Sequence, residues 1–166
     1  MEILTKDEFD INKNEIFDKI RDGSIFIHPT DTIYGIGCNA LDSKSVKKIR
    51  LIKGRATTPF SIIAPSKKWI CDNFEIKQHA KEWIEKLPGA LTLILKKKDG
   101  KVAEEVAPGL NTLGIRIPNH WLSSAITELG FPVVTTSANK VGEDFMTSLD
   151  DLDISIKEHI DFIIYE

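Results

Sequence analysis

Hydroxyl groups, glycines and cations gather in the stretch from Ile25 to Arg55. The apolar run that opens this stretch stops at Pro29, and the hydroxyl residues Thr30 and Thr32 follow directly. Such groups, placed just beyond the end of a strand, are what a site for anions needs. The residue types therefore predict an anion-binding site near this strand end.

Two cations, Lys53 and Arg55, flank Gly54 where the next helix should end. A lysine is a mobile point charge that suits a phosphate changing during a reaction, whereas the planar fork of an arginine suits fixed oxyanions. The alternative is that the negative end of the helix dipole attracts both cations. That alternative explains Lys53 better than Arg55, because Arg55 lies past the helix.

The glycines Gly35 and Gly37 come shortly after Asp31. Glycines let a backbone approach a ligand closely, and this favours a binding loop. The alternative is a tight turn in which Asp31 bonds its own backbone. On these residues alone the turn is favoured, because the Gly-x-Gly spacing lacks the dinucleotide pattern.

Polar side chains also follow a later apolar run, at Thr135, Ser137 and Asn139. In open α/β sheets, ligands bind beyond the carboxyl ends of strands. These neutral groups suit phosphate oxygens or a ribose, and a simple loop cap is an equally good interpretation.

Arg116 alternates with Ile115 and Ile117, so we expect it to lie on the opposite face of a strand from them, with Thr112 four residues before it. A cation there needs water or an anion. A surface ion pair is an equal alternative.

Composition indicates one globular domain spanning residues 1–166, because hydrophobic residues make up 42% of the chain. No secretory signal or membrane-spanning run is visible. Cys38 and Cys71 are far apart and form no metal or redox motif, so we expect a reducing, cytoplasmic compartment. The four histidines are scattered, and no protein-built metal site is predicted.

The positive charge is unevenly placed, although the net charge is −3. The segment 43–71 holds eight of the 22 cations and none of the 25 acidic residues. The net charge disfavours a general nucleic-acid binder, while the basic segment offers one preferred face for phosphate. For Lys44, Lys47 and Lys48 a solvated helix face is the favoured interpretation.

Hydrophobic periodicity predicts alternating helices and strands without repeats. The expected helices are Ile11 to Arg21 with Asn12 and Glu15 as a capping box, one beginning after Asp42 or Ser43, Ile76 to Leu87, one capped by Asn119, and Asp150 to Ile160. The expected strands are Ser24 to His28, Phe60 to Ala64, Leu91 to Lys96, Leu113 to Ile117, Pro132 to Thr135 and Asp161 to Tyr165. This order favours an α/β fold with a mainly parallel or mixed sheet.

Five blocks in order, HPTDTIYGIGCNALDSKSVKKIRLIKGR, PFSIIAPS, LPGALTLILKKK, LGIRIPNH and PVVTTSAN, resemble the YrdC-like threonylcarbamoyl-AMP synthase family. The match runs from about Ile25 to Asn139. It implies an α/β fold with a twisted, mixed and largely parallel sheet, flanking helices and a concave basic cavity.

The resemblance also implies a reaction in which L-threonine, bicarbonate or CO2, and ATP give threonylcarbamoyl-AMP and pyrophosphate. It places catalytic roles on Lys53 and Arg55, threonine binding on Thr30, Arg116 and Thr135, and ATP binding on Lys53, Arg55, Thr112, Ser137 and Asn139. Mg²⁺ would accompany ATP. The implied partners are a tRNA-modifying threonylcarbamoyl transferase complex and RNA contacted through the basic face.

The chain departs from the family pattern in three places. The loop from Arg55 to Pro59 is about one residue short, and the histidine that longer members place near Ile63 is absent. Relatives also continue past the strand matched by Asp161 to Tyr165, so we expect either a truncated chain or a short form with a more open site. Two other functions stay open: a non-catalytic module of this fold that binds double-stranded RNA, tRNA or a nucleotide, and an assembly protein whose basic segment docks a partner.

Overall fold

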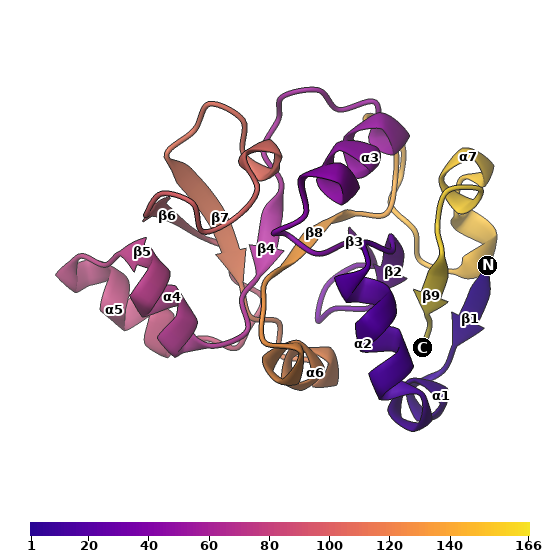
Figure 1. The fold of residues 1–166 in the computed structure, drawn as a ribbon, viewed down its shortest axis with the longest axis horizontal. Helices are drawn as coiled ribbons and strands as arrows, with labels where there is room; N and C mark the ends of the chain where they lie inside the picture. Colours follow the sequence, from indigo (N-terminus) through magenta and orange to yellow (C-terminus); the bar gives the residue numbers. More distant parts are fainter.

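The computed structural model describes residues 1–166, and its centre is one nine-stranded sheet (Figure 1). The strand order is β1-β9-β2-β3-β8-β4-β7-β6-β5. The strands are β1 Glu2–Leu4, β2 Phe26–His28, β3 Gly35–Gly37, β4 Ser61–Ile63, β5 Phe74–Glu75, β6 Leu93–Lys97, β7 Thr112–Arg116, β8 Val133–Ser137 and β9 Phe162–Ile164.

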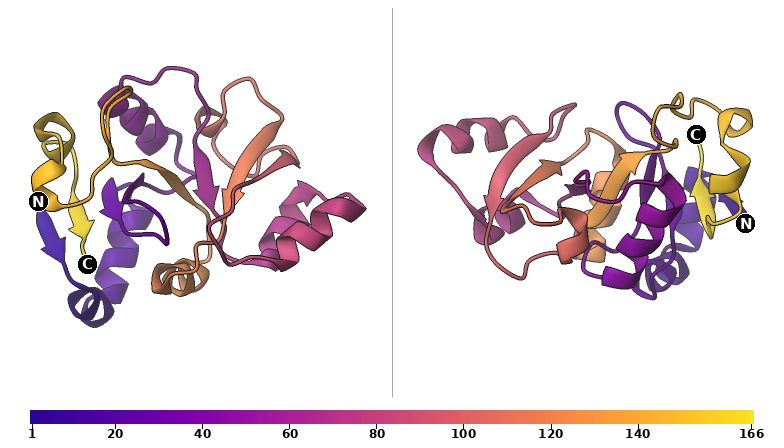
Figure 2. Two further views of the ribbon diagram at one scale, coloured as in Figure 1. Left: turned by 180° about the vertical axis from the view of Figure 1, so that it is seen from behind. Right: turned by 90° about the horizontal axis from the view of Figure 1, so that it is seen from above.

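Seven α-helices and two short 3-10 helices flank this sheet. They are α1 Lys6–Ile11, α2 Lys13–Arg21, α3 Ser43–Lys53, α4 Lys67–Asn73, α5 Gln78–Glu85, α6 Trp121–Leu129, α7 Ile154–Lys157, η1 Glu104–Val106 and η2 Leu149–Asp151. Seen from above in Figure 2, α4 and α5 lie at one end of the molecule, and both termini lie at the other. The α/β class and the mixed sheet predicted from the sequence are therefore confirmed.

The expectation of a largely parallel sheet is wrong. Only β1–β9, β2–β9 and β4–β7 pair in parallel, and the other five neighbouring pairs are antiparallel. One reason is visible at β2 and β3, which are joined by a short turn. A parallel pair needs a crossover of a dozen or more residues, so a short turn can only return the chain antiparallel.

Two apolar clusters lie on opposite faces of the sheet. Successive residues of one strand alternate between them: Ile27 belongs to one cluster and Phe26 to the other, as do Val134 and Val133. Helices α3, α4, α5 and α7 supply side chains to the first cluster. Helices α1, α2 and α6 supply the second, and Figure 1 shows these three along the lower edge of the molecule.

The first predicted helix, Ile11 to Arg21, is α2, and the preceding helix α1 was not predicted from the sequence. The predicted capping box is misplaced. Asn12 does precede α2, but its side chain donates to the carbonyl of Glu8 at 2.9 Å and caps no N–H group. Asn12 also ends α1, so its amide bonds the last turn behind it. The reciprocal capping box is formed by Thr5 and Glu8 at the start of α1.

Two other predicted helix starts are wrong for local reasons. His120 caps α6, because its Nδ1 accepts from the Leu122 N–H, while the Asn119 N–H is used elsewhere. The helix expected from Asp150 to Ile160 is only α7. There Asp153 accepts from the N–H groups of the first turn and sets a new start after η2.

One sheet face changes from apolar to polar along its own strands. In β8 the side chains on this face are Val133, Thr135 and Ser137, and in β4 they are Ile63 and Ser61. Val133 and Ile63 pack in the cluster covered by α1, α2 and α6. The polar residues Ser61, Thr135 and Ser137, which continue this face, line a cavity.

Candidate active site

The cavity has a volume of about 220 Å³ and lies over the polar part of the sheet. Its wall includes Arg55, Ser61, Arg116, Thr135, Thr136 and Ser137. These residues come from the loop after α3 and from strands β4, β7 and β8. Four side chains singled out from the sequence therefore meet at one cavity: Arg55, Arg116, Thr135 and Ser137.

Arg55 owes its place to the end of α3. Gly54 ends the helix with a positive φ of 61°, a conformation that glycine adopts without strain. The guanidinium of Arg55 donates from Nη2 to the Pro59 carbonyl at 3.2 Å and lies 5.5 Å above the Phe60 ring. Its remaining donors are available to an anion in the cavity.

Arg50 shapes the loop that carries Arg55. This buried side chain donates to the carbonyls of Arg55 at 2.9 Å and Thr58 at 3.1 Å. It also donates to the carbonyls of Glu105 at 2.6 Å and Val106 at 3.2 Å. One guanidinium thus joins α3, the loop and η1, a role that the sequence analysis did not identify.

Lys53 lies beneath the cavity wall and does not line the cavity. Its side chain is buried, and Nζ donates to the carbonyls of Ser137 and of Asn139, the latter at 2.6 Å. Burial, and then the nearby charge of Arg55, lowers the pKa of Lys53 to about 8. In this arrangement its ammonium fixes the backbone that follows β8.

The segment after β8 is further fixed by its own side chains. Ser137 donates from Oγ to Oδ1 of Asn139, and the Asn139 amide donates to the Glu143 carbonyl at 2.6 Å. The two residues are neighbours, but only Ser137 lines the cavity.

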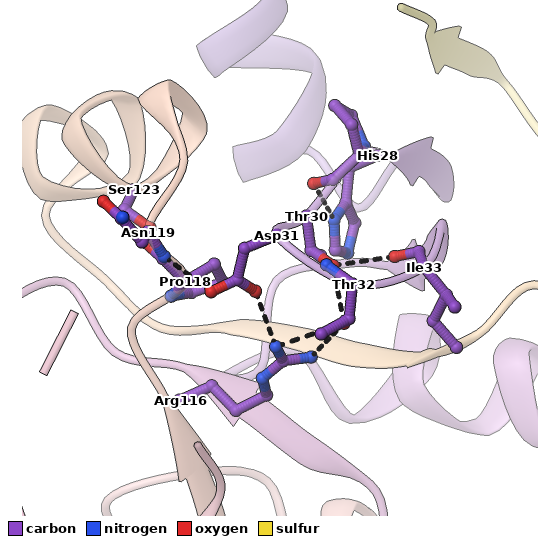
Figure 3. Close-up of polar contacts among 10 residues, drawn as sticks. His28, Thr30, Asp31, Thr32, Ile33, Arg116, Pro118, Asn119 and Ser123 are labelled. Carbon is purple, nitrogen blue, oxygen red and sulfur yellow. Dashed lines mark hydrogen bonds and ion pairs between the residues drawn. The ribbon is translucent and has the colours of Figure 1, made fainter. Parts of the chain in front are cut away.

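Thr30 is not brought to the same cavity as Arg116. Its hydroxyl closes the loop after β2: it donates to the Ile33 carbonyl at 2.8 Å and accepts from the Thr32 N–H at 3.0 Å (Figure 3). Thr30 lines a neighbouring cavity of about 290 Å³, which shares Ile33 and Tyr34 with the first. Its hydroxyl therefore serves the turn that was expected to be closed by Asp31.

Thr112 stands on the same face of β7 as Arg116, because strand residues two and four apart share a face. It does not line the cavity. Between them lies Gly114, where a side-chain carbon would approach Ser61 Oγ to 2.6 Å. Gly114 therefore leaves room for Ser61, which also lines the cavity. Ser61 was not predicted from the sequence, because a single serine in a strand gives no signal.

The Gly-x-Gly pair admits the ring of His28. A side-chain carbon at Gly35 would lie 2.8 Å from the His28 ring, and one at Gly37 would lie 3.0 Å from it. The buried ring donates from Nδ1 to the Pro29 carbonyl at 3.2 Å, and Nε2 has no partner. These two glycines therefore make room for the His28 side chain, whereas the sequence suggested room for a ligand. Gly35 also lines the cavity.

The structure brings together no group of three or more histidine, cysteine or acidic side chains suited to a metal ion. None of its helices combines the length and apolar character that crossing a membrane requires.

Comparison with known proteins shows the family of the chain. The Sua5/YciO/YrdC family model, described as telomere recombination, matches residues 18–166. The chain belongs to the Sua5/YciO/YrdC family. The resemblance drawn from the five sequence blocks is thereby confirmed.

Individual relatives agree with this membership. A protein from Methanocaldococcus jannaschii is 41% identical over 149 residues, which is 88% of this chain and 69% of that protein. The threonylcarbamoyl-AMP synthase of Bacillus subtilis is 36% identical over 133 residues, covering 75% of this chain and 37% of its own. The crystal structure of P. abyssi Sua5 complexed with L-threonine has 31% identity and a TM-score of 0.87, with coverage of 98% of this chain and 49% of that one. The chain thus spans between about a third and two thirds of the length of these relatives.

Proposed function

We propose that the protein is a threonylcarbamoyl-AMP synthase that acts in the threonylcarbamoyladenosine modification of tRNA. The observation that carries this function is the meeting of Arg55, Arg116, Thr135 and Ser137 at one cavity. Two arginines and two hydroxyls are suited to a polyphosphate beside an amino-acid carboxylate. Relatives named for this activity, and a related structure that holds L-threonine, support the choice.

Arg116 binds the threonine carboxylate in this proposal, because a guanidinium fork matches a carboxylate. Thr135 lies in the same cavity and offers a hydroxyl to the amino acid. Thr30 acts indirectly on threonine binding, because its hydroxyl closes the turn at Ile33, a residue that lines both cavities. It contacts threonine directly only if the substrate also enters the second cavity.

ATP binds along the other side, where Arg55 neutralises phosphate charge and Ser137 bonds a phosphate oxygen. Lys53 contributes positive charge from beneath while holding the carbonyls of Ser137 and Asn139 in place. We assign Thr112 and Asn139 to the rim of the nucleotide site. Mg²⁺ enters with ATP, since it is commonly held by substrate phosphates and a few carboxylates or waters.

The chemistry requires positioning and charge neutralisation from the protein. The threonine amine adds to CO2 and loses a proton to water, giving a carbamate. A carbamate oxygen then attacks the α-phosphorus of ATP, and the bond from that phosphorus to the leaving pyrophosphate breaks. Arg55 and Lys53 stabilise the charge that moves onto pyrophosphate. The product passes to a threonylcarbamoyl transferase complex in the cytoplasm.

The test is to incubate the protein with ATP, L-threonine and bicarbonate and to look for threonylcarbamoyl-AMP by mass spectrometry. Pyrophosphate release should depend on threonine and fall at least about tenfold in Lys53→Ala and Arg55→Ala, because each removes charge from the transition state. Lys48→Ala is the matched control, since Lys48 is exposed on the same helix and should leave the rate unchanged. Unchanged rates in both test variants would remove these roles, and duplex RNA binding without ATP consumption would favour the non-catalytic alternative.

A further inference from the structure

Arg116 is held by a carboxylate from a loop 85 residues away in the sequence. Asp31 Oδ1 accepts from Arg116 Nη2 at 2.8 Å, and Oδ2 accepts from the Asn119 N–H at 2.9 Å (Figure 3). The Asp31 side chain is only 12% exposed and that of Arg116 only 13%. This is a largely buried crosslink in which both carboxylate oxygens are used, unlike an exposed surface ion pair.

Asp31 lies outside the wall of the cavity, whereas Arg116 is part of it. The carboxylate therefore holds the guanidinium from a side that a ligand in the cavity does not occupy. It also ties the guanidinium to the backbone of Asn119, three residues further along the chain. Thr30 closes the loop turn, so the Asp31 carboxylate is free for this long-range contact.

The guanidinium is not saturated by these contacts. Thr32 Oγ1 lies 3.3 Å from both Nη1 and Nη2, which is long for a hydrogen bond, and Nε is buried without a partner. An arginine has five N–H donors, and only one of them makes a short bond here. A carboxylate that enters the cavity thus meets a guanidinium that is fixed in place and still has donors to offer.

We propose that Asp31 is a positioning residue for Arg116, which it fixes in the orientation that receives the carboxylate of the amino-acid substrate. This inference rests on the proposed function and adds a residue to it. A free arginine side chain loses much rotamer freedom when it binds, and fixing it beforehand removes that loss from the binding step. Asp31 thereby raises affinity for threonine without touching it.

The substitution Asp31→Asn tests this role, because it keeps the shape and removes the charge. We expect the KM for threonine to rise about tenfold, the loss associated with one charge-assisted hydrogen bond. The KM for ATP and kcat at saturating threonine should stay within about twofold of wild type. Asp18→Asn is the matched control, since Asp18 forms an exposed pair with Arg21 and should change none of these values.

A double-substitution cycle separates positioning from a general structural role. In an Arg116→Lys background, Asp31→Asn should cost little more, because a lysine cannot use the fixed orientation. Equal rises in the KM for ATP and threonine, additive effects in the cycle, or an unchanged or lowered KM for threonine would each overturn the proposal. A lowered KM would mean that Asp31 competes with substrate for Arg116. A wild-type protein that neither turns over nor binds threonine would instead refute the proposed function.

Discussion

The imidazole of His28 lies in the protein interior with one nitrogen unpaired, so its protonation is tied to folding. Burial lowers the pKa of His28 from 6.5 to about 4. In the unfolded chain the same group takes up a proton near pH 6.5. Between these two values the unfolded state binds more protons than the folded state, so stability falls as the pH falls from 6.5 to 4.

His28→Phe should remove this dependence, because a phenyl ring is planar like imidazole but does not titrate. In wild type, His28 alone should cost up to about 3 kcal/mol of the free energy of unfolding across this pH range. Urea denaturation at several pH values measures the difference between the two proteins, which cancels the contribution of carboxylates common to both. His159→Phe is the control, since His159 is exposed. If the free energy of unfolding depended on pH equally in wild type and His28→Phe, the lowered pKa of His28 would be contradicted.

At the scale of elements, the loop between α3 and β4 depends on one buried guanidinium. Arg50 donates to four carbonyls in the loop and in η1, and its guanidinium carbon lies 4.3 Å from the centre of the Phe60 ring. A lysine carries a single compact ammonium and cannot reach all four acceptors. Arg50→Lys therefore loses several of these hydrogen bonds.

We expect Arg50→Lys to lower the free energy of unfolding by about 2 kcal/mol or more, since hydrogen bonds from a charged donor contribute more than neutral ones. Because the loop carries Arg55, the KM for ATP should rise while the KM for threonine changes little. Chemical denaturation and steady-state kinetics provide these two measurements. Arg21→Lys makes the same exchange in an exposed pair and should be nearly neutral. A stability within about 0.5 kcal/mol of wild type would show that the Arg50 bonds are replaceable.

Local signals in the sequence predicted local features of these elements. Asp42 does cap α3, Gly54 does end it with a positive φ, and Arg116 does lie on the face opposite Ile115. Strand direction was not predicted correctly, because it depends on how long each connection is and where it returns.

Hydrophobic periodicity does not indicate contacts between segments that are distant in the sequence. Nothing in the pattern around Asp31 indicates Arg116, and the carbonyl partners of Lys53 lie more than 80 residues away. The packing of His28 against Gly35 and Gly37 depends on the register between β2 and β3. For this reason the sequence indicated several residues that line the cavity but not the groups that hold them in place.

At the scale of the whole molecule, the basic segment from residue 43 to 71 presents less positive charge than its sequence indicates. Three of its eight cations, Lys47, Lys67 and Lys68, form ion pairs with acidic residues. Two more, Arg50 and Lys53, are buried and donate to carbonyls, and Arg55 lines the cavity. Lys44 and Lys48 remain exposed without an ion pair. A surface of this kind offers few contacts to a phosphate backbone.

We therefore expect weak binding to duplex RNA with a shallow salt dependence. The slope of log K against log salt concentration is about −0.9 for each phosphate contact measured on duplex DNA, so two or three contacts give a slope near −2. Fluorescence anisotropy with a labelled duplex over a range of salt concentrations measures it, and the double variant Lys44→Ala/Lys48→Ala should flatten it further. A slope steeper than about −5 that survives this double substitution would require a second cationic surface. It would also favour the RNA-binding alternative, because the unpaired cations of this segment are too few for so many phosphate contacts.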